Sequence, residues 1–150
     1  MGKLLETDCI VMDLDEQNKE EILEILGQKL LDSGRIDDLE AFLENVKERE
    51  HIEPTAIGDN IGMPHGRTDH VIIPSLCFAR LKEPIIWNEK TNETASIIIM
   101  IAVPKEDNTH HLKIISQLAR NLMHDEFKAL LVNGDQKSVY RTINNVLIEV

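Results

Sequence analysis

The chain has 150 residues, of which 42% are hydrophobic and 29% are charged, so its composition is that of one globular domain with a sizeable core. Its formal net charge is -11 and only 3% of its residues are aromatic, which argues against nucleic-acid binding and against attraction to an anionic membrane surface. No apolar run approaches the roughly 20 residues of a membrane helix, and the first residues lack the apolar core of a signal peptide, so we expect a cytoplasmic protein.

Two amphipathic helices are predicted in the first third of the chain. Residues 17–32 have apolar side chains at a helical period, and Ser33-Gly34 is typical of a helix C-cap. Residues 37–49 form the second predicted helix, which begins at Asp37-Asp38, where acidic side chains suit the positive end of the helix dipole. Its expected buried residues are Leu39, Phe42, Leu43 and Val46.

The middle of the chain has the pattern of strands separated by Gly, Pro and Asp. We expect strands at 57–63, 71–80 and 94–103, with a short edge strand at 84–87. The segment 95–103 is nearly all apolar, which indicates a central strand that is covered on both faces.

Helices return in the last third, at residues 109–123, 125–132 and 136–148. Asp125 and Asp135 lie near the predicted starts of the last two helices. The expected apolar face of the first consists of Leu112, Ile115, Leu118, Ala119 and Leu122. The order of elements predicts an α/β fold, a single-domain sandwich over residues 1–150 with a central mixed β-sheet flanked by helices on both faces.

The segment Met63-Pro64-His65-Gly66-Arg67 holds the first candidate for chemistry. Pro64 restricts the backbone, and Gly66 permits a sharp turn, so His65 is expected at a strand-to-loop junction. An imidazole can act there as nucleophile, base or metal ligand. A loop histidine without a function is the alternative.

Two further positions could join His65. His110 and His111 follow a polar loop; because successive helical residues diverge by about 100°, only one can face a given pocket, and the spacing to Ile115 and Leu118 favours His111. Arg49, near the end of the second helix, suits bidentate recognition of phosphate. The ordinary alternatives are a packing histidine and a charge that complements the helix dipole.

Other common motifs are absent. The sequence has no nucleotide-binding glycine loop, no HExxH metal motif and no hydrolase serine motif. Cys9 and Cys77 are far apart and indicate no disulfide framework. His51, His70 and His124 have no motif around them and are expected at the surface.

These residues, in order, resemble a known family. Arg49-Glu50, then Gly58 to Gly66, an apolar strand, and His111 to Arg120 are similar to the IIA component of the bacterial phosphoenolpyruvate:sugar phosphotransferase system (PTS), fructose–mannitol type. The resemblance covers residues 4 to 147. It implies that His65 is the phosphorylated histidine, His111 the second active-site histidine and Arg49 the supporting arginine.

The resemblance also implies a mechanism and partners. His65 would accept a phosphoryl group from a histidine of the carrier protein HPr and pass it to a cysteine of a IIB domain, without cofactor, metal or nucleotide. The membrane would be involved only through the IIC transporter. Arg49, Arg67 or Lys105 would make the active face less negative, because the chain as a whole is acidic.

Two other functions remain open at this stage. The nitrogen-related branch of the same family has the same histidine but a regulatory role. A metal-dependent hydrolase could use His65 and His111 with a carboxylate such as Asp69 or Asp107. The transported sugar is not specified by these residues, and fructose is the leading hypothesis.

Overall fold

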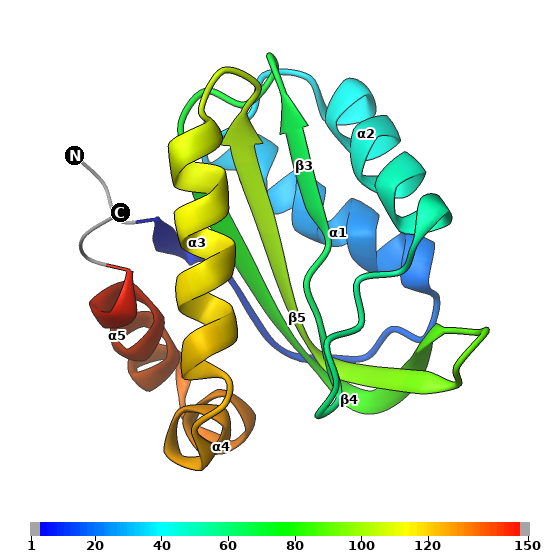
Figure 1. The fold of residues 1–150 in the computed structure, drawn as a ribbon, viewed down its shortest axis with the longest axis vertical. Helices are drawn as coiled ribbons and strands as arrows, with labels where there is room; N and C mark the ends of the chain where they lie inside the picture. The colour runs from blue at the N-terminus through cyan, green and yellow to red at the C-terminus, as the bar shows by residue number, and fades with distance from the viewer. Residues whose placement is uncertain (1–3, 148–150) are drawn as a thin grey trace.

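The computed structural model describes residues 4–147, which form a mixed five-stranded sheet between two layers of helices (Figure 1). In the view of Figure 1, α3 (Asn108–Asn121) crosses the front of the sheet and α1 (Lys19–Asp32) lies behind it. The predicted α/β sandwich is therefore confirmed. Within the described residues, we find no helix with the length and apolar character that spanning a membrane would require.

The sheet is built around its most buried strand. Its strands are β1 (Leu5–Leu14), β2 (Ile61–Gly62), β3 (His65–Thr68), β4 (Ser75–Asn88) and β5 (Glu93–Pro104). The order is β1-β4-β5-β2, and β3 also pairs with β5. β5 is antiparallel to β4 and parallel to β2 and β3, and most of its side chains are buried, which confirms the prediction of a covered central strand.

The helices agree with the predicted ones to within a few residues. The remaining three are α2 (Leu39–Ile52), α4 (Asp125–Asn133) and α5 (Gln136–Val146). Asn18, Asp38 and Asp135 are N-caps whose side chains accept a backbone N–H of the first turn, and Ser33 is the C-cap of α1. α2 continues three residues past its predicted end, so Arg49 lies in its last turn.

The strand predictions need correction. β1 and β3 were not predicted as strands at all. The expected strand at 57–63 is reduced to β2, because Gly58, Asp59 and Asn60 have positive φ and form a turn. The separate edge strand at 84–87 is instead the second half of β4, which runs on past an irregularity in its register between Arg80 and Ile85.

The apolar face of α3 also differs from the predicted one. Ile114, Leu118 and Leu122 are buried, whereas Ala119 is exposed and Ile115 is only partly covered. Among the described side chains of α3, the buried ones follow the i, i+4, i+8 positions, and the side chain of Leu112 lies outside the described part of the chain.

Candidate functional site

His65 lies where an edge strand of the sheet resumes after a gap. β2 and β3 pair with β5 in one register, with Ile61 opposite Ile97 and His65 opposite Ile101, so Met63-Pro64 interrupts the ladder without shifting it. The carbonyl of Pro64 still accepts the backbone N–H of Ile101 at 2.9 Å. The predicted strand-to-loop junction is thus a break within a strand. The pairing with β5 continues on both sides of the break, and His65 is the first paired residue after it.

The break gives the imidazole a defined partner. Nδ1 of His65 lies 3.1 Å from the carbonyl oxygen of Met63. A carbonyl oxygen can only accept, so Nδ1 carries the proton and the lone pair of the neutral ring is on Nε2. The Met63 carbonyl therefore selects the tautomer of His65.

Gly66 has a different role from the predicted turn, because its φ is not positive and it lies inside β3. A Cβ at this position would lie 2.7 Å from the ring of Phe42 and 2.8 Å from a methyl of Val46. The glycine thus permits α2 to approach β3 closely (Figure 1). Phe42, Val46 and Arg49 are spaced four and three residues apart, so this contact brings Arg49 toward His65.

His65 and Arg49 line the same shallow cavity of about 230 Å³, together with Asn45, Glu48, Ile52 and Arg67. Arg49 donates from Nη1 to the carbonyl of Glu53 at 2.7 Å, which holds its guanidinium at the end of α2.

Arg67 lies two residues after His65 and hence on the same side of β3. Its Nε donates to the carbonyl of Lys105 at 2.9 Å, and its backbone N–H donates to Oδ1 of Asn45 at 2.9 Å. Two guanidinium groups and an imidazole therefore share one small cavity, although the chain as a whole is acidic.

Burial lowers the pKa of His65 below its ordinary value, and the positive charge of Arg49 acts in the same direction. The bond to the Met63 carbonyl and the charge of Glu50 oppose this effect without reversing it. At neutral pH the imidazole is therefore uncharged and its Nε2 lone pair is present. This is the state that a nucleophile or a metal ligand requires.

The positions of His110 and His111 are in the first turns of α3, but their side chains lie outside the part of the chain that the structure describes. The choice between them stays a prediction. Among the described side chains, no three His, Cys, Asp or Glu residues come together as a metal site. Asp69 is exposed and does not line the cavity.

Comparison with known proteins identifies the family. Residues 3–146 match the family described as "Phosphoenolpyruvate-dependent sugar phosphotransferase system, EIIA 2". The chain belongs to this family. It is 36% identical to a PTS system fructose-specific EIIA component of Haloferax volcanii over 143 aligned residues. The alignment covers 95% of this chain and 91% of that protein. It is therefore a phosphotransferase component of the fructose–mannitol class of EIIA proteins.

Two solved structures share the EIIA fold. The nitrogen regulatory protein IIA-Ntr of Neisseria meningitidis has a TM-score of 0.85 at 23% identity, with 93% of this chain and 96% of that chain covered. The IIAMtl enzyme of Escherichia coli, solved in complex with phosphorylated IIBMtl, has a TM-score of 0.80 at 21% identity, with 95% and 99% covered.

Sequence reasoning brought His65 and Arg49 to one site and named Arg67 as a nearby charge, but it missed two contributors. Asn45 lies one turn before Arg49 on α2, a spacing that could have indicated it. The Met63 carbonyl carries no signal in the sequence, because every residue has a carbonyl and only the fold decides which one meets an imidazole.

Proposed function

We propose that this EIIA domain carries a phosphoryl group on Nε2 of His65, that it accepts this group from HPr and that it passes it to a IIB domain in sugar uptake. The observation that carries the proposal is the hydrogen bond from Nδ1 of His65 to the Met63 carbonyl, in a cavity shared with Arg49 and Arg67. It supplies an uncharged, oriented nucleophile beside two cations that suit phosphate.

In the accepting step, the Nε2 lone pair attacks the phosphorus of phospho-HPr, the N–P bond of the HPr histidine breaks, and a new N–P bond forms on His65. The transition state spreads negative charge over three phosphoryl oxygens, so catalysis depends on positioning and on charge stabilisation. Arg49 and Arg67, which line the same cavity as His65, are proposed for the second task, and His111 is proposed as an additional hydrogen-bond donor.

In the donating step, a thiolate of the IIB domain attacks the same phosphorus and the bond to Nε2 breaks. The Nδ1 proton, held by the Met63 carbonyl, stays on the ring throughout. The leaving group is then a neutral imidazole rather than an anion, which lowers the barrier. The solved complex of IIAMtl with phosphorylated IIBMtl supports a IIB domain as the acceptor.

The test starts from the purified chain, phosphoenolpyruvate, enzyme I and HPr, with the intact mass as readout. We expect a gain of one phosphate, its loss in His65→Ala and its retention in His70→Ala, since His70 instead binds Asp37 at 2.9 Å on the surface. NMR coupling between phosphorus and the ring nitrogens identifies the nitrogen. A phosphate that His65→Ala still carries, or coupling to Nδ1, contradicts the proposal.

Fructose is the sugar that we propose, because the fructose-specific relative is 36% identical over nearly the full length of both proteins. The likeness to the nitrogen regulatory protein is one of fold at 23% identity and does not favour a regulatory role. Deletion of the gene should abolish fructose uptake, and the wild type but not His65→Ala should restore it. Normal uptake after deletion, together with no transfer to any IIB domain, would instead support regulation.

A further inference from the structure

Glu50 is a buried carboxylate that the proposed transfer does not use. It follows Arg49 on α2 and is 5% exposed. Oε1 accepts the backbone N–H of Thr55 at 3.2 Å, and Oε2 accepts the Thr55 hydroxyl. Lys19 completes the set, with Nζ 2.9 Å from Oε1. Burial of a charge is costly unless donors compensate it, and three donors do so here.

Lys19 is itself held in place from the sheet. Its ammonium donates to the carbonyl of Trp87 at 2.9 Å and lies 4.4 Å from the centroid of the Trp87 ring. The ammonium group of Lys19 on α1 therefore links Glu50 on α2 to Trp87 on β4. The position of the Glu50 carboxylate is thus fixed by contacts outside α2 as well as by the helix itself.

Thr55 transmits this position toward the active histidine. While its N–H and hydroxyl bind Glu50, its carbonyl accepts the backbone N–H of Met63 at 2.9 Å. Thr55 and Met63 are both buried. The carbonyl of the same residue, Met63, is the one to which Nδ1 of His65 is hydrogen-bonded. The peptide between Met63 and Pro64 is planar, so a fixed Met63 restricts the direction of this carbonyl.

We infer that Glu50 is a positioning residue for His65: it clamps Thr55, Thr55 holds Met63, and the Met63 carbonyl holds the imidazole in the Nδ1–H tautomer. The consequence for phosphoryl transfer rests on the function proposed above, but the effect on the tautomer does not. Glu50 touches neither phosphate nor imidazole in this scheme and acts through two backbone carbonyls.

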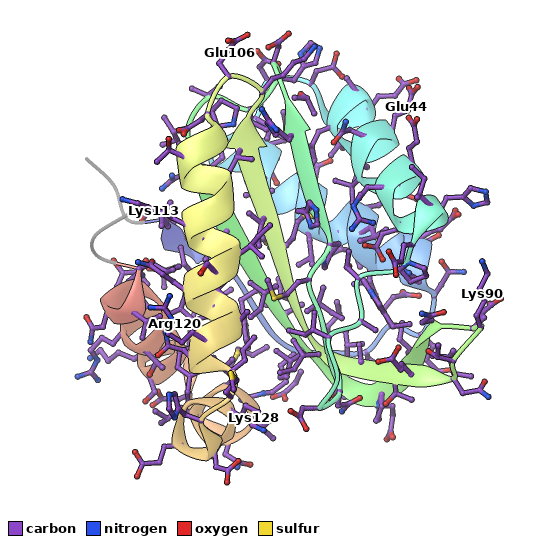
Figure 2. All side chains as sticks on the ribbon, in the orientation of Figure 1. Glu44, Lys90, Glu106, Lys113, Arg120 and Lys128 are labelled. Atoms are coloured by element: carbon purple, nitrogen blue, oxygen red, sulfur yellow. The ribbon has the colours of Figure 1, made fainter. Side chains whose placement is uncertain are left out.

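The conservative and the disruptive substitution separate position from charge. In Glu50→Gln, the amide oxygen can accept the Thr55 N–H and the amide NH₂ can donate to the Thr55 hydroxyl, so the clamp is kept and the charge is lost. In Glu50→Ala the clamp is lost as well. Glu44→Ala is the matched control, because Glu44 is an exposed glutamate of the same helix that projects outward (Figure 2).

The first readout is the nitrogen NMR spectrum of the His65 side chain, which reports the tautomer and needs no phosphate donor. We expect the Nδ1–H tautomer in wild type, Glu44→Ala and Glu50→Gln, and a shift toward the Nε2–H tautomer in Glu50→Ala. A wild-type tautomer in folded Glu50→Ala overturns the inference. If Glu50→Ala does not fold, Thr55→Val removes the hydroxyl donor instead, and an unchanged tautomer there overturns the inference equally.

The second readout is single-turnover transfer from phosphorylated HPr. We expect Glu50→Ala to be slower by about tenfold or more and Glu50→Gln to stay within about threefold of wild type, because misorientation of a nucleophile is costly. Equal loss in both variants with an unchanged tautomer would mean that the charge acts and not the clamp, and would overturn the inference. If the tautomer shifts but the wild type accepts no phosphate, the clamp stands and the proposed function fails.

Discussion

Gly66 and Phe42 are so close that a methyl group on the glycine would lie 2.7 Å from the aromatic ring. The contact joins the strand that carries His65 to the helix that carries Arg49. It therefore sets the distance between a nucleophile and a cation that come from different parts of the chain. A substitution here should affect chemistry as well as stability.

Gly66→Ala is expected to destabilise the protein by about 1–3 kcal/mol, because overpacking forces α2 away from β3. It should also slow phosphate acceptance, because Arg49 moves with the helix. The control is Gly34→Ala, in which the new Cβ meets no atom within 4 Å but the positive φ of 76° is strained. Chemical denaturation and transfer rates should show two destabilised variants, of which only Gly66→Ala transfers slowly when folded.

Arg49→Ala should slow phosphoryl transfer by at least about tenfold, or roughly 1.4 kcal/mol in the barrier. It should also raise the pKa of His65, because the positive charge of Arg49 lowers it. Stability should fall by about 1 kcal/mol, the value of one hydrogen bond, with loss of the contact to the Glu53 carbonyl. The control is Lys47→Ala, which removes another cation of the same helix; Lys47 pairs with Glu24 and does not line the cavity of His65. If Arg49→Ala transfers phosphate at the wild-type rate, Arg49 has no role in transfer and serves only to stabilise the end of α2.

Two histidines should titrate on opposite sides of the ordinary pKa of about 6.5. Burial lowers the pKa of His65, whereas the hydrogen bond to Asp37 raises the pKa of His70. Well above pH 6.5, His65 is neutral in both the folded and the unfolded chain. As the pH falls through about 6.5, the unfolded chain binds the proton first, so the lowered pKa of His65 reduces stability. The His70 contribution is present below the unfolded pKa and is lost as the pH rises through the folded one.

An NMR titration checks both directions in one sample. Phosphate acceptance should accordingly be flat from pH 8 to about 7 and should decline only below about pH 6.5, when the nucleophile becomes protonated. A His65 midpoint above that of His70 would contradict the assigned environments.

His111→Ala should impair transfer from phosphorylated His65 to a IIB acceptor, while His110→Ala should have little effect. The buried residues Ile114 and Leu118 lie three and seven positions after 111, so the helical period predicts that residue 111 faces the packed side of α3. Single-turnover transfer with the two variants decides between them. Greater damage from His110→Ala would mean that residue 110 faces the site.

The helices were predictable because each carries its information locally. In α1, the N-cap Asn18, the C-cap Ser33 and the apolar period between them define a helix before any tertiary contact exists. The same holds for β5, whose nearly continuous apolar run has few alternatives to the centre of a sheet.

The strands β1 and β3 could not be predicted in this way. β3 consists of His65, Gly66, Arg67 and Thr68, a set with no strand pattern, and it is extended only because β5 pairs with it. β1 pairs in parallel with β4, about 70 residues away, and irregularities in its register remove the alternation that would reveal it. In the site, residue identity pointed to His65 and Arg49, but the partner atoms are backbone carbonyls that only the assembled sheet selects.

The unbroken register on either side of Met63-Pro64 has a consequence for motion. Reactive residues on loops can move by local opening of the chain, which costs little free energy. His65 instead shares a hydrogen-bonded ladder with β5, whose side chains are mostly buried, so its backbone is released only when the hydrogen bonds of that ladder break. Donor and acceptor proteins, arriving one after the other, would then meet the same rigid nucleophile, and neither has to order it first.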